Sequence, residues 1–198
     1  MLNSIYNTSA YTVKLCMQDF YEDGIKRDRL LWTGDLRIEA LVGYYCFGDI
    51  GLARKSLMQL ADIQLPDGLI PGVGPDPNSK YLPDYCAYWV MALADYYRYS
   101  GDLYTVRLLY PTLQKLMEWF QANCDETGLF VKADRPGWWI FADWDESLDK
   151  RDRVMAMEAL YYWALRDAVS LAQTAENPQD ARTYSARAEK HSAAANTQ

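Results

Sequence analysis

The chain has 198 residues, of which half are apolar and 14% aromatic, and it carries a net charge of −7. This length and composition predict one domain, or two small ones, with a sizeable core. The acidic balance argues against nucleic acid as a partner, because phosphates require clustered Lys and Arg, and the lack of an apolar run of about 18 residues argues against a membrane span.

Apolar residues recur at helical spacing along most of the chain. We expect helices at residues 4–21, 36–47, 50–64, 83–99, 103 to about 123, and 151–174, with a weaker helix from about 177. Gly-Asp turns separate the second helix from the third and the fourth from the fifth, and Pro111 is expected to kink the fifth or to begin its second half. Residues 65–80 form a Pro/Gly-rich loop, and residues 124–150 are irregular or hold a short strand pair.

Two kinds of helix alternate in this pattern. The helix at 83–99 is apolar nearly all round, as a helix buried on every side would be, whereas the helix after it has a single apolar face, as an outer helix would. An inner helix, a Gly-Asp turn, an outer helix and a Gly-Leu pair recur in residues 44–69 and 96–129. Repeated helical hairpins predict an all-α fold, either an α/α toroid or an α-solenoid. In a toroid the long loops share one face, where a site would form.

The reactive residue types present limit which kinds of catalysis the chain can perform. His191 is the single histidine and lies in a polar, Ala-rich tail, which excludes Ser-His-Asp and Cys-His catalysis and a histidine-based zinc site. No Gly-rich phosphate loop is present either, so we expect no metal and no cofactor, and any chemistry must depend on carboxylates. The four cysteines lie far apart without a CxxC pair and are expected to be buried free thiols: Cys16, Cys46, Cys86 and Cys124.

Two loops combine acids with aromatic residues at unusual density. They are DGIKRDRLLWTGD (23–35) and GWWIFADWDE (137–146). One interpretation is a pair of solvated turns whose charges pair locally. The other is a sugar site, because the C–H bonds of a sugar stack on aromatic rings while its hydroxyls bond to carboxylates. A carboxyl beside Trp can also have its pKa raised, which suits a general acid.

Together with YLPDYCAYWV (81–90), these two segments resemble glycoside hydrolase family 78, the α-L-rhamnosidases, over residues 1 to about 175. The resemblance implies an (α/α)6 barrel and hydrolysis of terminal α-L-rhamnose with inversion. Asp28 takes the place of the family's catalytic Glu, so it would protonate the glycosidic oxygen. Its carboxyl reaches about 1.5 Å less far than that of Glu, so the backbone would have to approach the leaving oxygen more closely.

The resemblance also implies which residues surround the sugar. Acids and an arginine would hold the hydroxyls, and tryptophans would form the pocket walls. These substrate-binding residues are Asp23, Arg27, Trp32, Asp35, Trp89, Asp143 and Trp144. For Trp89, helical spacing alone favours the core, whereas the resemblance places it on the pocket wall. Asp143 fits a Gly-Asp-Trp-like segment of the family, in which Ala142 replaces the Gly.

Other tryptophans are expected to pack inside the molecule. Trp119 and Trp163 lie at helical core positions. Trp138 and Trp139 are adjacent, so we expect one of them to point inward and the other toward the pocket.

The chain supplies about seven of the twelve helices that such a barrel needs. We therefore expect an incomplete (α/α)6 toroid, in which residues 1–175 form a partial catalytic barrel and residues 176–198 a last helix and a polar tail. The inverting base of the family comes from a later helix-loop unit and has to lie about 6.5–9.5 Å from the acid. Asp145 and Glu146 are conceivable substitutes for it within this chain.

The expected partner is a rhamnose-containing oligosaccharide or glycoside, with no nucleic acid and no membrane. The first residues lack the basic start and apolar run of a signal peptide, and the compartment stays open. Inner helices that an incomplete ring leaves exposed predict self-association. Two alternatives remain: a non-catalytic carbohydrate-binding remnant, which would bind rhamnose without hydrolysis, and a helical-repeat interaction scaffold, whose melting temperature would not respond to rhamnose.

Overall fold

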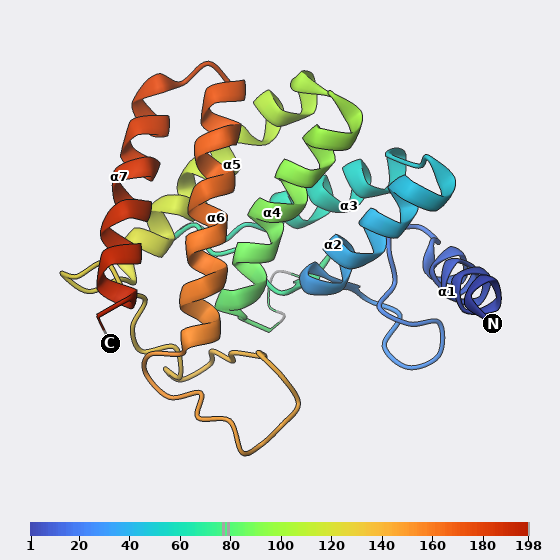
Figure 1. The fold of residues 1–198 in the computed structure, drawn as a ribbon, viewed down its shortest axis with the longest axis horizontal. Helices are drawn as coiled ribbons and strands as arrows, with labels where there is room; N and C mark the ends of the chain where they lie inside the picture. Colours follow the sequence, from blue (N-terminus) through green and yellow to red (C-terminus); the bar gives the residue numbers. More distant parts are fainter. Residues whose placement is uncertain (77, 79, 198) are drawn as a thin grey trace.

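The computed structural model describes residues 1–76, 78 and 80–197, and these are mostly helical (Figure 1). The helices are α1 (Leu2–Cys16), α2 (Thr33–Val42), α3 (Gly51–Asp62), α4 (Pro83–Ser100), α5 (Leu103–Ala122), α6 (Met155–Thr174) and α7 (Pro178–Ala195). After α1 they pair as three hairpins: α2 with α3, α4 with α5, and α6 with α7. This arrangement confirms the predicted all-α, incomplete toroid of helical hairpins.

The helices α2, α4 and α6 form an inner row, in which α4 packs between the other two (Figure 1). Nearly every side chain of α4 from Pro83 to Tyr96 is buried, as its all-round apolar pattern predicted. The outer helix α5 buries one face and includes Pro111 within an unbroken helix, rather than a break at that residue. Trp119 on that face is buried, which confirms the expectation for it.

The first helix is shorter than predicted, because the chain turns into the core before residue 21. The helix α1 ends at Cys16, and Met17 pairs with Tyr21 in an isolated bridge. Tyr21 is fully buried, and its hydroxyl lies 2.2 Å from where a Cβ at Gly43 would be. Since Gly43 opens the π-helical turn Gly43–Phe47 that continues α2, glycine is needed for this close approach.

Two short strands, which the pattern did not predict, lead into the second helix. β1 (Leu31–Trp32) pairs antiparallel with β2 (Val73–Gly74) and so brings the Pro/Gly-rich connection beside the start of α2. The Thr33 N–H donates to the Gly72 carbonyl at 3.0 Å. As a result α2 begins at Thr33, and Asp35 lies in its first turn instead of preceding it.

The connection from residue 123 to 154 is irregular, and the strand pair considered for it is absent from this fully described stretch. Instead, Trp138 forms an isolated parallel bridge with Tyr81. The helix α6 begins at Met155, later than predicted, because the loop uses Asp152: its Oδ1 accepts the Lys132 N–H at 2.9 Å.

Two side chains lie elsewhere than the sequence indicated. His191, expected in a polar tail, is buried between α7 and α6, where Nε2 lies 2.7 Å from Glu158 Oε2. The small Ala residues of α7 allow this close packing. Trp163, expected in the core, is instead 48% exposed on α6. An Arg37 guanidinium lies over its ring, 4.8 Å from the centroid, and covers part of it.

The four cysteines are free thiols, of which Cys16 and Cys86 are buried and Cys46 and Cys124 partly buried. The prediction of free, buried thiols therefore holds fully for the first two. Among the helices of the described residues, none is both long enough and apolar enough to cross a membrane.

Candidate functional site

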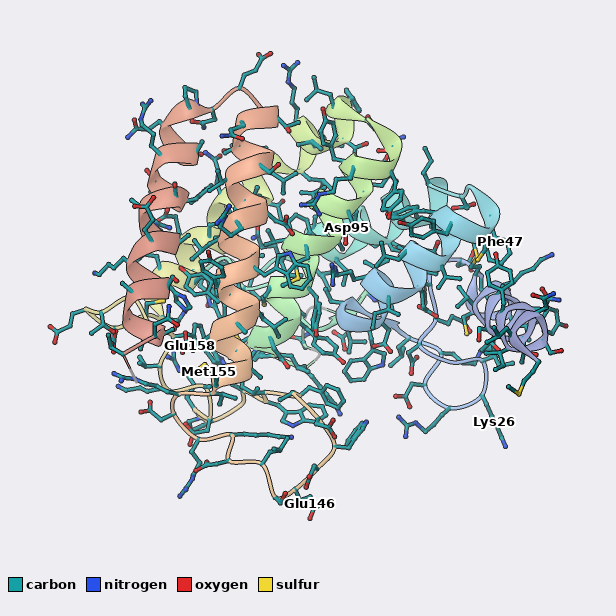
Figure 2. The ribbon with its side chains drawn as sticks, viewed as in Figure 1. Lys26, Phe47, Asp95, Glu146, Met155 and Glu158 are labelled. Atoms are coloured by element: carbon teal, nitrogen blue, oxygen red, sulfur yellow. The ribbon has the colours of Figure 1, made fainter. Side chains whose placement is uncertain are left out.

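Two loops that are far apart in the sequence meet at one cavity. Loop 23–30, with Lys26 at its tip, and the connection 123–154, with Glu146 at its far end, both lie along the lower edge of Figure 2. The cavity between them has a volume of about 300 Å³. We call it the acid–aromatic cavity, and it is lined by Asp23, Arg27, Asp28, Trp32, Asp35, Lys80, Tyr85, Trp139, Phe141 and Trp144.

Most of the residues that the sequence assigned to the site line this cavity. They are Asp23, Arg27, Asp28, Trp32, Asp35 and Trp144. The carboxyl of residue 28 and the indole of residue 144 therefore share one cavity, which a sugar site built from both loops requires.

Asp28 is placed by a loop that closes on itself. The Asp23 N–H donates to the Leu30 carbonyl at 3.0 Å, and the Leu30 N–H donates back to Asp23 Oδ1 at 2.9 Å. Next to this closure, Arg29 Nε lies 3.4 Å from Oε2 of the buried Glu22. Arg29 has φ of +56°, the left-handed region that L-residues avoid, so the ion pair helps to hold a strained turn directly after Asp28.

Arg27 is the cation nearest to the candidate acid. Its Nε lies 3.1 Å from Asp28 Oδ1 and its second terminal nitrogen 3.4 Å from Asp28 Oδ2. Because the Arg27 side chain is 78% exposed, this contact is worth little stability, and the guanidinium is free to turn toward a ligand.

Two carboxyls lie one helical turn apart on α2 below the loop. Burial, together with the charge of Asp23, raises the pKa of Asp35 to about 6. Burial, followed by the charges of Asp35 and Asp23, raises the pKa of Glu39 to about 8. Glu39 is 9% exposed, and its Oε2 has no hydrogen-bond partner in the described residues. At neutral pH, Glu39 is therefore mostly protonated, which limits the negative charge beneath the cavity.

Aromatic rings form the other wall of the cavity. Trp32 meets Tyr85 edge to face, with ring centroids 6.0 Å apart. Trp144 packs on Trp139 at 5.7 Å and on Phe141 at 5.1 Å, yet remains 69% exposed. A large exposed indole held by neighbouring rings suits stacking on a ligand.

Lys80 lies between two tryptophans of the cavity. Its ammonium lies 5.6 Å from the centroid of the Trp32 ring and 5.3 Å from that of Trp139. Both distances are within the range of cation–π attraction.

A second, more apolar cavity of about 480 Å³ adjoins the first. The two cavities share Asp35, Tyr85 and Phe141. Ile38 is 65% exposed and, with Trp163, lines this apolar cavity along the inner row. At the junction, a Cβ on Gly34 would lie 2.7 Å from the Tyr85 ring, so glycine allows α2 and α4 to approach there.

Two of the predicted site residues do not line the acid–aromatic cavity. Trp89 is fully buried in α4, and its indole N–H donates to the Leu57 carbonyl at 3.2 Å, so it packs in the core as its helical spacing indicated. Asp143 is exposed and turns its Oδ1 to the Asp145 N–H at 3.0 Å. Asp145 and Glu146, the conceivable bases, are also exposed and lie outside the cavity lining.

Sequence reasoning missed Lys80, Tyr85 and Phe141. The sequence offered only their neighbourhood as a hint. Lys80 and Tyr85 lie on either side of Pro83, where a helix was predicted to start, and Phe141 lies within the second acid–aromatic loop. The adjacent tryptophans divide as expected. Trp138 stacks on Phe130, with centroids 6.0 Å apart, whereas Trp139 lines the cavity.

In the part of the chain that the structure describes, no group of three or more His, Cys, Asp or Glu side chains is arranged to hold a metal ion. The three aspartates of the cavity, Asp23, Asp28 and Asp35, present carboxylate oxygens that can accept hydrogen bonds from a hydroxylated ligand.

Comparison with solved structures supports the fold. A rhamnosidase from Klebsiella oxytoca with rhamnose bound is 33% identical, with a TM-score of 0.85 over 98% of this chain and 37% of that chain. A family 78 rhamnosidase of Bacillus sp. GL1 is 27% identical, with a TM-score of 0.87 over 96% of this chain and 20% of that chain.

A third structure, the α-L-rhamnosidase from Dictyoglumus thermophilum, is 21% identical and shares the fold, with a TM-score of 0.72 over 96% of this chain and 22% of that chain. This chain thus spans 37% or less of the lengths of these three proteins. A search of curated proteins found no match.

The model of one protein family, described as the bacterial alpha-L-rhamnosidase 6 hairpin glycosidase domain, matches residues 1–198. The three helical hairpins that follow α1 are half of the six that this description names. The chain therefore belongs to the bacterial α-L-rhamnosidase six-hairpin glycosidase family.

Proposed function

We propose that this chain carries the acid-bearing part of an α-L-rhamnosidase site, which acts on terminal α-L-rhamnose in an oligosaccharide or glycoside. The observation that carries the proposal is the convergence of Asp28, Arg27 and two further aspartates with Trp32 and Trp144 on one cavity. Family membership supports the reaction class, and the lining of the cavity supports the choice of residues.

In this proposal Asp28 is the general acid. It donates its proton to the glycosidic oxygen as the bond to the sugar breaks and positive charge develops at the anomeric carbon. Arg27 lies beside Asp28 and is free to turn toward the sugar, where its guanidinium would donate a hydrogen bond to a rhamnose hydroxyl. The self-closing loop fixes the position of Asp28 before the sugar arrives, which lowers the entropic cost of reaching the transition state.

Asp23 and Asp35 would accept hydrogen bonds from the rhamnose hydroxyls. Asp35 suits this role because its first-turn position on α2 is fixed by the strand pair below it. The apolar face of rhamnose, including its methyl group, would stack between Trp32 and Trp144.

We further propose that hydrolysis inverts the anomeric centre, which requires a carboxylate base across the sugar from Asp28 at about 6.5–9.5 Å. We assign this base to no described residue, because Asp145 and Glu146 lie outside the cavity lining. Turnover is therefore expected only where a further carboxylate faces Asp28 across the bound sugar.

The test uses an aryl α-L-rhamnoside and two readouts, turnover and rhamnose binding by tryptophan fluorescence. In any form of the protein that turns the rhamnoside over, Asp28→Asn removes the proton donor while keeping the shape of the side chain, so turnover should fall by about a thousandfold. Rhamnose affinity should stay nearly unchanged. Proton NMR should show β-L-rhamnose as the first product. A variant with wild-type turnover would remove Asp28 from its role, and α-L-rhamnose as the first product would refute inversion.

A second candidate is a carbohydrate-binding module without catalysis. The exposed position of Asp145 and Glu146 outside the cavity favours it, because a site without a base binds sugar and does not hydrolyse it. Saturable rhamnose binding without any Asp28-dependent turnover would support this candidate over the first.

A further inference from the structure

The aromatic wall of the cavity lies on a segment without regular structure. Residues 139–144, here called the aromatic segment, contribute Trp139, Phe141 and Trp144 to the cavity. The segment belongs to the long connection between α5 and α6, which has no helix or strand of its own between residues 123 and 154. A wall of this kind must be held in place by side chains from elsewhere.

One buried carboxylate of the helical framework contacts this segment directly. Asp84 Oδ2 accepts the Phe141 N–H at 3.0 Å and the Ala142 N–H at 3.2 Å. Asp84 lies in the first turn of α4 and is 2% exposed. A single oxygen from a buried helical side chain thus binds two consecutive amides of the aromatic segment.

The backbone conformation at this contact is unfavourable without an interaction that holds it. Ala142 has φ of +47°, in the left-handed region that an L-residue with a Cβ rarely occupies. The bond from the Ala142 N–H to Asp84 compensates for this strain and turns Phe141 toward the cavity. Lys150 Nζ adds a bond to the Phe141 carbonyl at 2.8 Å from within the same connection.

We propose that Asp84 is a positioning residue, which fixes the aromatic segment and so sets the shape of the sugar cavity without touching the sugar. The expected effect of Asp84 on rhamnose affinity rests on the function proposed above. The anchoring itself is a property of the fold and can be measured without any ligand.

The chemistry of Asp84 suits an anchor. Burial raises its pKa to about 6, while the Ala142 and Phe141 amides oppose that rise. Above this pH the acceptor is an anion, and an anionic acceptor makes stronger hydrogen bonds to amides than a neutral one. Its other oxygen, Oδ1, has no partner among the described residues. An amide oxygen of the same shape at position 84 would therefore retain both bonds.

The chain contains a matched control. Glu158 lies in the first turn of α6, is 4% exposed, and its Oε2 accepts the Phe130 N–H at 3.2 Å. It anchors the same long connection through one amide, and the same oxygen also lies beside His191, but Phe130 does not line the acid–aromatic cavity. Loss of Glu158 should thus lower stability without moving the aromatic segment.

The experiment compares wild type with Asp84→Ala, Asp84→Asn and Glu158→Ala. Limited proteolysis with chymotrypsin, with products identified by mass spectrometry, measures cleavage after Phe141 and Trp144 relative to cleavage after the buried Trp119. This ratio reports local release of the segment, since global unfolding would expose all three sites. Asp84→Ala should raise the ratio at least tenfold, whereas Asp84→Asn and Glu158→Ala should stay within threefold of wild type.

Rhamnose binding by the same four proteins gives the second readout. Asp84→Ala should weaken binding about tenfold, Asp84→Asn should restore most of it, and Glu158→Ala should leave it nearly unchanged. An unchanged cleavage ratio in Asp84→Ala would overturn the anchoring. A raised ratio with unaltered affinity would overturn the effect on the site. If wild type binds no rhamnose, the proposed function fails, and the cleavage ratio alone decides the anchoring.

Discussion

The acid side and the aromatic side of the cavity are held in different ways. On the acid side, loop 23–30 closes on itself through the Asp23 and Leu30 backbone and the Asp23 carboxylate. On the aromatic side, residues 139–144 depend on Asp84 from a helix more than fifty positions earlier in the chain. The position of Asp28, the proposed proton donor, is thus set by local interactions, whereas the shape of the aromatic wall depends on a residue of α4.

The largest expected effect is on the pH dependence of stability, through the ionisation of Glu39 on the acid side. The pKa of Glu39 is about 8 in the folded protein against a usual value of 4.5. The preference of the folded protein for protonated Glu39 contributes stability that is fully present below pH 4.5 and is lost as the pH rises through 8. Relative to wild type, Glu39→Gln should therefore gain about 1.4 kcal/mol of unfolding free energy per pH unit across this window.

Urea denaturation at pH 5, 7 and 8.5 measures this difference. Glu146→Gln, at the exposed far end of the other loop, is the matched control and should follow wild type at all three values. A constant difference in unfolding free energy between Glu39→Gln and wild type from pH 5 to 8.5 would show that ionisation of Glu39 does not destabilise the folded protein.

The next effect separates closure of the loop from contact with the sugar. Asp23→Ala removes the acceptor for the Leu30 N–H, at 2.9 Å, together with a proposed rhamnose contact. A hydrogen bond to a charged group contributes about 1.5–3 kcal/mol, so rhamnose affinity should fall about a hundredfold. Asp23→Asn keeps the acceptor, and should preserve the melting temperature while losing only part of the affinity.

Calorimetric titration with rhamnose and thermal melting measure the two quantities. Equal loss of melting temperature in both variants would mean that the Asp23 carboxylate acts by its charge rather than by closing the loop. The local character of the acid side would then be disproved.

The smallest effect lies on the aromatic side. Trp144 is 69% exposed, so Trp144→Ala should change the unfolding free energy by less than about 0.5 kcal/mol. Loss of a stacking surface should nevertheless weaken rhamnose binding about tenfold. Trp138→Ala offers a contrast, because Trp138 stacks on Phe130 and should cost stability rather than affinity. Undiminished rhamnose affinity in Trp144→Ala would remove this indole from the site.

The sequence allowed prediction of those features that depend on local pattern. Helical periodicity gave seven helices, and the acid–aromatic motifs gave Asp28 and Trp144 in one cavity. Features that depend on contacts across hairpins were not predictable in this way. Tyr85 enters the cavity because it meets Trp32 from another hairpin, and the strand pair forms between segments about forty residues apart.

The error over Trp89 has the same origin. The resemblance suggested an aromatic wall in this region, and the helical spacing suggested the core. The structure follows the spacing, since α4 lies between α2 and α6 and leaves Trp89 no exposed side. The cavity instead uses Trp139, which the adjacent-tryptophan argument had left as one of two choices.

The closeness of Gly34 to the Tyr85 ring limits which residues position 34 can accept. A Cβ at position 34 would lie 2.7 Å from that ring, so a larger residue there requires the Tyr85 ring or the start of α2 to shift. Tyr85 and Asp35 line both cavities, so such a shift would act where the two cavities meet. A single hydrogen in place of a methyl group thus sets how closely the first turn of α2, which carries Asp35, can lie to the Tyr85 ring of α4.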